Sequence, residues 1–346
     1  MRALRQRTRD ARVLAAVLAL GIGLVAGCSS GKTSSGDASN AAGSKKSGTI
    51  TIAYLQKQGD QQYFVDEANG AKAEAKKLGG VNVDVVDLGT DSNKAISAMQ
   101  TEVAQKVDGI AIVVPDQKIG PQVIDAANGA GIALVASDDP IMSGSNKPAP
   151  FVGFDSVQMG TKVGQEAGTL FKKAGWSASN TKVLAAYQQD LSDCQQREQG
   201  EEAGFKSAAG TTIPVVKVGT DNSVIDAQNK AAATLTANPN VKHWVVWGCN
   251  DESETGVVTA LQNGHVSPSN IDGVGLGAYL TCKDWKAGVQ SGNKAALYIG
   301  GADVGAASVN TLVAYLRNST PLPPKTIAKT TMVGPQNWKS VMSECS

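Results

Sequence analysis

The sequence predicts an α/β protein with two doubly wound parallel-sheet lobes joined by a hinge. Apolar strand patterns alternate with helical patterns from residue 49 onward, which favours parallel strands linked by right-handed crossovers. The alternation starts again with a new first strand at residues 182–187. The run at residues 243–247 is apolar throughout, as is typical of a strand that is buried on both faces. We therefore expect two sheets of similar plan, and a ligand would close the two lobes by a hinge motion.

In the first half of the chain, the apolar runs and turn residues define the order of the elements. The expected strands lie at residues 49–55, 81–87, 109–114, 133–137 and 151–153. Helices are expected at residues 63–78 and 119–130, each followed by glycine. Asp91 is a predicted cap for a third helix, whose apolar positions Ile96, Met99 and Val103 follow helical spacing.

In the second half, the same rules predict a second set of elements. Strands are expected at residues 182–187, 213–217, 243–248, 272–277 and 295–299. Helices are expected at residues 156–173, 195–207, 224–237, 254–261, 283–291 and 304–317, before a short strand and helix end the chain. We expect the first lobe to hold residues 49–154 plus about 301–326, and the second to hold residues 155–300 plus about 327–346.

The N-terminus has the pattern of an export signal. Five arginines precede an apolar run at residues 13–25, which is shorter than the roughly 20 residues of a membrane span. The run ends in Leu-Val-Ala-Gly before Cys28, which resembles a bacterial lipobox in which the cysteine is lipidated. The alternative is an ordinary secretory signal with an incidental cysteine. Residues 29–48 are rich in Gly, Ser and Lys and are expected to form a flexible tether.

Charge and cysteine content narrow the functional classes. The net charge of +1 shows no excess of basic residues that would favour binding of nucleic acid. Four cysteines remain after Cys28, and an even number in an exported protein indicates disulfides. Three pairings are open; Cys249 and Cys282 each follow a predicted strand near the same sheet edge, which favours that pair slightly. With two histidines and no CxxC or HExxH motif, we expect neither a metal nor a cofactor.

The end of the strand at residues 243–248 is the first candidate for a binding position. Asn250 and Asp251 follow it directly and precede a helix. Ligands of open α/β sheets bind at this carboxyl edge, so both residues are candidates. Asn and Asp are also common helix caps, which is the structural alternative.

Several stretches, taken in order, resemble the type I periplasmic sugar-binding proteins of ABC importers, and most closely the L-arabinose-binding members. The similarity covers about residues 49–343. The stretches that carry it are Lys57-Gln58, Tyr63-Phe64, the run at residues 115–120, Ser137-Asp138-Asp139, the run at residues 161–164, Leu191 with Arg197, Lys242-His243-Trp244 and Asn250-Asp251.

This resemblance implies roles for individual residues. The side chains that bind sugar hydroxyls would come from both lobes. They would be Lys57, Asp138 and Asp139 in the first lobe, and Arg197 and Asn250 in the second. Tyr63 and Phe64 would face the apolar side of the sugar ring. Each residue also has a structural alternative: a surface lysine, a turn at Asp138-Asp139-Pro140, core aromatics at the start of a helix, and a solvated helical arginine.

The chain departs from this family at several binding positions. The family has a glutamate where Gln61 stands and an asparagine where Gly277 stands. Asp193 and Cys249 replace residues that contact sugar in the family, and Gln158 replaces a methionine. We therefore include Gln61, Gln158 and Asp193 in the predicted site and expect a pentose or a short-chain polyol rather than arabinose specifically.

The functional prediction is a substrate-binding lipoprotein that delivers a small carbohydrate to an ABC permease and its ATPase. We expect a monomer on the outer side of the cytoplasmic membrane, held there only by a lipid anchor. An enzyme is disfavoured because the sequence lacks a G-x-S-x-G elbow and a P-loop motif. A signal peptide stands where a repressor would carry its DNA-binding unit. A subunit that presents a ligand to a membrane sensor or chemoreceptor remains the alternative.

Overall fold

A computed structural model describes residues 45–342 and 345, and these residues form two six-stranded sheets. The predicted export signal, Cys28 and most of the predicted tether lie outside the described residues. The strands of the first sheet are β1 (Ile50–Lys57), β2 (Val81–Gly89), β3 (Gly109–Ile112), β4 (Ala133–Ser137), β5 (Phe151–Gly153) and β11 (Lys325–Ile327). Those of the second are β6 (Thr181–Tyr187), β7 (Val215–Gly219), β8 (His243–Gly248), β9 (Ile271–Gly277), β10 (Asn293–Ile299) and β12 (Thr330–Val333).

The two sheets share one plan, which confirms the predicted fold class. Their orders are β11-β5-β4-β3-β1-β2 and β12-β10-β9-β8-β6-β7. Among these twelve described strands, all pairings are parallel except that of β10 with β12. The last two short strands thus join different sheets, although only three and four residues long. The boundaries of the two lobes stay a prediction. That prediction assigns the chain around β11 to the first lobe and the chain around β12 to the second.

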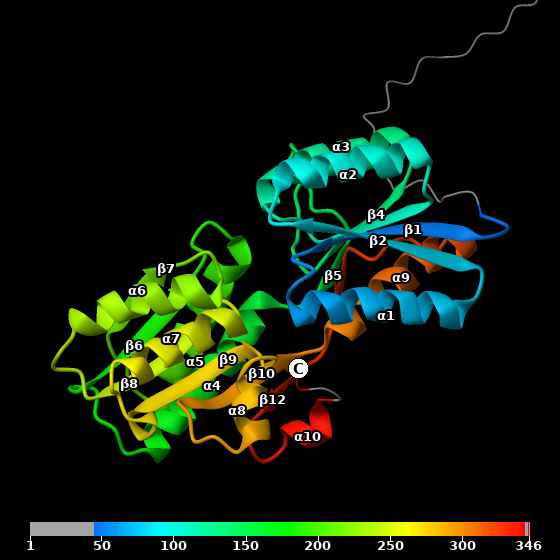
Figure 1. Ribbon diagram of the computed structural model, residues 1–346. Helices are drawn as coiled ribbons and strands as arrows, with labels where there is room; N and C mark the ends of the chain where they lie inside the picture. The colour runs from blue at the N-terminus through cyan, green and yellow to red at the C-terminus, as the bar shows by residue number, and fades with distance from the viewer. Residues whose placement is uncertain (1–44, 343–344, 346) are drawn as a thin grey trace, which may run out of the picture. The chain divides into compact units, whose positions relative to one another are not determined.

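Helices cover both faces of each sheet. The helices around the first sheet are α1 (Gln62–Leu78), α2 (Ser92–Gln105), the 3-10 turn η1 (Gln117–Ile119), α3 (Gly120–Ala130) and α9 (Gly301–Asn318). Those of the second half are α4 (Ser156–Lys173), α5 (Ser192–Ala209), α6 (Val224–Thr236), α7 (Asp251–Asn263), η2 (Pro268–Asn270), α8 (Thr281–Ala287) and α10 (Trp338–Val341). In Figure 1, α2 and α3 lie on one face of the first sheet, and α1 and α9 on the other.

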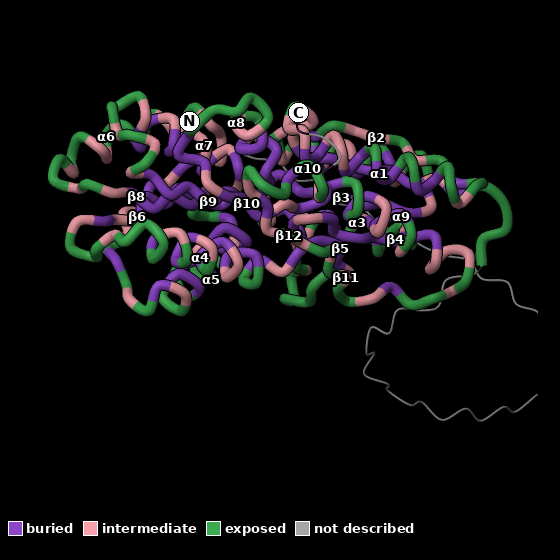
Figure 2. The backbone as a smooth tube through the Cα atoms, turned by 90° about the horizontal axis from the view of Figure 1, so that it is seen from below, coloured by how far each residue is buried: buried purple, intermediate pink, exposed green. Residues whose placement is uncertain are grey.

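The period of two along each central strand explains this double covering. In β1, Tyr54 joins the core beneath α1 and α9, whereas the adjacent Leu55 joins the core beneath α2 and α3. In β8, Trp247 and Trp244 likewise belong to different cores. All seven residues of β9 are buried (Figure 2), as expected for a strand between two helical layers.

Helix α5, which carries the predicted site residues Asp193 and Arg197, packs closely against α4. A Cβ on Gly160 would lie 1.9 Å from the carbonyl oxygen of Arg197, and one on Gly164 would lie 2.0 Å from that of Glu201. Only glycine permits this approach of two backbones. The α5 helix begins at residue 192 rather than 195, which places Asp193 in its first turn.

The disulfides correct the pairing that the sequence slightly favoured. The structure pairs Cys194 with Cys249 and Cys282 with Cys345. Cys282 lies in the first turn of α8 and packs in a small apolar cluster with the C-terminal residues, so its side chain faces the chain end rather than Cys249. Among the residues described, no helix has both the length and the apolar character of a membrane span.

We predict that Gly164→Ala destabilises the protein by about 1–3 kcal/mol, because the added methyl group forces α4 and α5 apart. Chemical denaturation of the variant measures this loss. The matched control is Gly129→Ala in α3, where a Cβ meets nothing within 4 Å. An unchanged free energy of unfolding for Gly164→Ala would contradict this account of the α4–α5 contact.

Candidate functional site

One cavity collects residues from the carboxyl ends of strands in both sheets. It has a volume of about 80 Å³. This is several times the roughly 10–15 Å³ that a single water needs, so the cavity is larger than a site for one water. All the residues predicted for the site line it except Gln158: Lys57, Gln61, Tyr63, Phe64, Asp138, Asp139, Asp193, Arg197 and Asn250.

Gln158 is the predicted site residue that does not reach this cavity. It is exposed on the first turn of α4, where its backbone N–H donates to the cap residue Asp155. The adjacent Met159 takes the buried position instead. Because neighbouring residues on a helix point in different directions, an offset of one residue is enough to move the side chain to solvent.

Lys57 and Asp139 form a buried ion pair on the first-sheet side. Lys57 Nζ lies 3.1 Å from Asp139 Oδ2, and both side chains are about nine-tenths buried. Lys57 ends β1, and Asp139 follows β4, so the two strand ends supply the two charges. This arrangement differs from the solvated surface lysine that the sequence left as an alternative.

Asp138 forms the turn after β4 and also contacts the cavity. Its φ of 59° is left-handed, which supports the turn interpretation. Its Oδ1 accepts a 2.9 Å hydrogen bond from the Tyr63 hydroxyl. Burial raises the pKa of Asp138 to about 6, and the charge of Asp139 adds to the rise.

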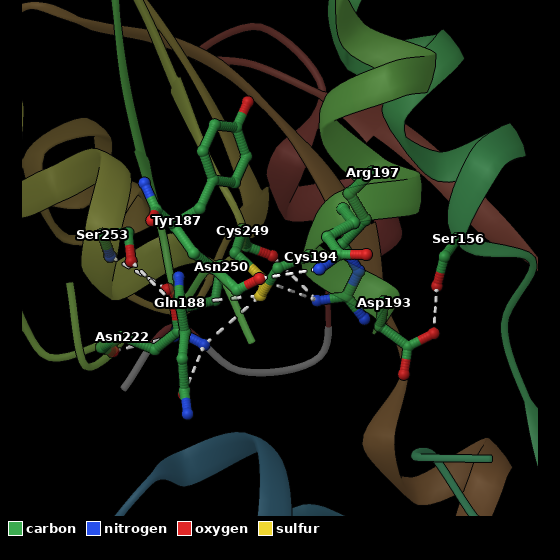
Figure 3. The surroundings of a disulfide bond; sticks show 12 residues. Ser156, Tyr187, Gln188, Asp193, Cys194, Arg197, Asn222, Cys249, Asn250 and Ser253 are labelled. Atoms are coloured by element: carbon green, nitrogen blue, oxygen red, sulfur yellow. Dashed lines mark hydrogen bonds between the residues drawn. A yellow bond between two sulfur atoms is a disulfide. The ribbon is translucent and has the colours of Figure 1, made fainter. Parts of the chain in front are cut away.

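Asp193 and Arg197 lie one turn apart on α5 (Figure 3), and both line the cavity. Asp193 Oδ1 accepts a 2.8 Å hydrogen bond from the Ser156 hydroxyl, and Arg197 Nη1 donates a 2.8 Å bond to the carbonyl oxygen of Cys249. Burial raises the pKa of Asp193 to about 7, with the charge of Asp139 as the next cause.

Two polar atoms in this wall have no partner among the described residues. They are Asp193 Oδ2 and Arg197 Nε, and both are buried. A buried polar group without a hydrogen bond costs about 1–3 kcal/mol, so two residues that line the cavity each carry one unsatisfied atom, an acceptor on Asp193 and a donor on Arg197.

Asn250 has the helix-capping role that the sequence left open. Its Oδ1 accepts a 3.1 Å hydrogen bond from Ser253 N, and its Nδ2 donates a 3.0 Å bond to the carbonyl oxygen of Asn222. The same side chain lines the cavity. The capping role is confirmed and the binding role stays a prediction, so a substitution here affects helix α7 as well as the wall.

Aromatic rings form much of the apolar part of the wall, together with Leu191, Leu276 and Ile299. Tyr63 and Phe64 are buried and meet edge to face with ring centroids 5.1 Å apart. Tyr279 lies 6.1 Å from Tyr63 and donates from its hydroxyl to the carbonyl oxygen of Ile299. These rings belong to the core and also face the cavity, so they offer carbon surface beside the charged groups.

The sequence analysis missed several lining residues. Tyr279 follows the glycine-rich strand β9, and Asn222 lies in the loop before α6 with a φ of 64°. Neither position has a periodic signal, although Asn at a left-handed loop position is a recognisable turn feature. Glu252 also lines the cavity, and burial raises its pKa to about 7.

Within the described residues, no cluster of three or more His, Cys, Asp or Glu side chains is arranged to hold a metal ion. Asp251, which was a candidate with Asn250, uses its carboxylate to accept from Leu280 N and the Thr281 hydroxyl. It therefore fastens the turn after β9.

Comparison with known proteins adds an independent observation. The model of the periplasmic binding protein domain family matches residues 52–320. An L-arabinose-binding periplasmic protein of an ABC transporter from Azospirillum brasilense is 28% identical over 85% of this chain and 89% of its own length. The L-arabinose-binding periplasmic protein of Escherichia coli is 27% identical over 66% of this chain and 70% of its own.

A solved structure has the same fold. It is a periplasmic solute-binding protein of an ABC transporter from Actinobacillus succinogenes, determined with bound D-allose. The TM-score is 0.73 at 19% identity, over 84% of this chain and all of the other. At this level of identity the likeness concerns the fold alone.

We predict that the ligand-free protein melts at a lower temperature at about pH 8.5 than at about pH 5. Burial raises the pKa of Glu201 from its ordinary 4.5 to about 8, and that of Glu67 likewise to about 8. A carboxyl with a raised pKa holds its proton more tightly in the folded chain. Its stabilising contribution is complete below the ordinary pKa and is lost as the pH rises through the folded value.

The matched variant for this prediction is Glu201→Gln. Gln does not titrate and can still accept from the Tyr187 hydroxyl, as Glu201 does. The difference in melting temperature between the two pH values should therefore shrink in the variant. A melting temperature that rises from pH 5 to pH 8.5 would refute this assignment.

Proposed function

This chain belongs to the periplasmic binding protein family, and we propose that it is the extracytoplasmic substrate-binding lipoprotein of an ABC importer. It would bind a small carbohydrate, a pentose or a short-chain polyol, in a cleft between its two lobes and close over it by a hinge motion. It performs no chemistry on that molecule. The names of two relatives, which call them binding proteins, support this part of the proposal.

The observation that carries the proposal is the set of charged groups around one small cavity. Lys57 and Asp139 end strands of the first sheet, whereas Asp193 and Arg197 come from the helix after β6. Hydrogen bonds from hydroxyls to such charged groups contribute about 1.5–3 kcal/mol each, more than bonds to neutral groups. The unpaired Asp193 Oδ2 and Arg197 Nε are an acceptor and a donor for this purpose.

The choice of a sugar or polyol rests on matching chemistry. Such a molecule has hydroxyls at its edges and C–H groups on its faces, and the wall offers both charged groups and the rings of Tyr63, Phe64 and Tyr279. Two curated relatives are named for L-arabinose. We keep the class broad because this wall has Gly277 and Asp193 at positions where the family differs.

The lipoprotein part of the proposal rests on the sequence before residue 45. The charged start, the apolar run and Cys28 stand in the order of a lipidated export signal. With residues 29–48 as a tether, a monomer would stay near the outer face of the membrane. There it would deliver its ligand to the permease of an importer, which the ATPase drives. The second candidate, a subunit that presents its ligand to a sensor, uses the same site and differs only in its partner.

We expect Arg197→Ala to weaken carbohydrate binding by about 2–5 kcal/mol, because it removes the buried donor and leaves Asp193 with less positive charge nearby. Calorimetry with L-arabinose, D-ribose, D-glucose, erythritol and xylitol identifies the molecules that the unmodified protein binds and then measures the loss. The control is Gln158→Ala, on α4 outside the cavity, which should leave the affinity unchanged. If none of these compounds binds the unmodified protein, the carbohydrate proposal fails.

The lipid anchor has a separate test. Cys28→Ser removes the thiol that would carry the lipid, so the exported protein should move from the membrane fraction to the soluble fraction. Immunoblots of fractionated cells measure the distribution. Retention of the variant in the membrane would remove the lipoprotein assignment and leave the binding site untouched.

A further inference from the structure

The Cys194–Cys249 disulfide lies in the wall of the cavity. Both cysteines line it, and both are buried, with exposed fractions of 0% and 2%. The bond connects the first turn of α5 to the residue that follows β8. It therefore joins the helix that carries Arg197 to the segment that carries Asn250.

On one side of the disulfide, Cys249 holds the guanidinium group of Arg197. Arg197 stands three residues after Cys194, so both side chains leave the same face of α5. Nη1 donates to the Cys249 carbonyl oxygen at 2.8 Å and lies 3.7 Å from its sulfur. This bond orients the guanidinium group, and in this orientation Nε is buried and has no partner among the described residues.

On the other side, the disulfide contacts the loop that holds Asn250. Asn222 Nδ2 lies 3.5 Å from the sulfur of Cys194, and the carbonyl oxygen of Asn222 accepts from Asn250 Nδ2 (Figure 3). Asn222 Oδ1 also accepts from Gln188 N at 3.1 Å. Three loops at the carboxyl edge of the second sheet thus meet around a single covalent bond.

We propose that the Cys194–Cys249 disulfide is a positioning element for ligand binding. It holds Arg197 and, through Asn222, Asn250 at the cavity wall, so that its removal weakens binding while the fold persists. This inference rests on the proposed function of the cavity. The Cys282–Cys345 disulfide, which does not line the cavity, fastens the C-terminal segment to α8 and has no such role.

The two disulfides form a matched pair for a test. They span 55 and 63 residues of sequence, so the constraint that each places on the unfolded chain is nearly equal. The full mature protein is compared with Cys194→Ala/Cys249→Ala and with Cys282→Ala/Cys345→Ala. We expect both variants to lose similar stability, which separates a general effect of cross-linking from a local effect on the site.

The direct readout is the NMR signal of the Arg197 Nε–H group, assigned through its absence in Arg197→Lys. It should be dispersed and protected from exchange in the unmodified protein and in the Cys282/Cys345 variant. In the Cys194/Cys249 variant it should move to the position of solvated arginines. This measurement requires no ligand. It therefore tests the inference even if none of the sugars and polyols binds and the proposed function is wrong.

Binding of whichever tested sugar or polyol the unmodified protein takes up supplies the second readout. Removal of Cys194–Cys249 should raise Kd at least about tenfold, and removal of Cys282–Cys345 less than about twofold. In an Arg197→Ala background, most of the effect of removing Cys194–Cys249 should disappear, because the disulfide acts largely through Arg197.

Three outcomes would overturn the inference. The first is an Arg197 signal that is unchanged without Cys194–Cys249, and the second is an equal rise in Kd for the two disulfide variants. If Cys194→Ala/Cys249→Ala does not fold, Cys194→Ser/Cys249→Ser replaces it, since Ser fills more of the sulfur volume. Failure of that variant to fold as well would make the bond structural and is the third such outcome.

Discussion

The structure depends on one constraint: strands that run in parallel all end at the same edge of their sheet. Each strand of the second sheet except β12 follows this rule, and the same holds throughout the first sheet. Polar residues placed directly after different strands are therefore brought together, although they lie far apart in the chain. Lys57 and Asp139 meet in this way across 82 residues of sequence.

The chemistry of the cavity follows from burying charges there. Ionised groups lose hydration when buried, and the raised pKa values of Asp138 and Asp193 express that loss. The ion pair with Lys57 compensates Asp139, whereas Asp193 keeps one oxygen unpaired. A ligand with hydroxyl groups would donate hydrogen bonds to these carboxylates. Burial of the charges would then both destabilise the ligand-free protein and strengthen its binding of that ligand.

Much of this arrangement could be predicted from the sequence because it depends on periodic patterns. Apolar runs and caps predicted both sheets, and the family resemblance placed nine lining residues, from Lys57 to Asn250, at one site. The favoured pairing of Cys249 with Cys282 is wrong because Cys282 faces the chain end, and Tyr279 and Asn222 were missed because they lie in turns whose course only the folded chain determines. Pairing of cysteines across such turns depends on tertiary contacts. The role of Gln158 stays a prediction; its side chain is exposed, one residue before the buried Met159.

A crystal structure of the mature protein, soaked with the sugar or polyol that binds it in solution, tests the central claim most directly. The account predicts electron density for that molecule in the cavity, with hydroxyl oxygens within hydrogen-bonding distance of Asp193 Oδ2 and Arg197 Nε and with Lys57 and Asp139 at the opposite side. Density at another location, with these four side chains making no contact to the bound molecule, would contradict it.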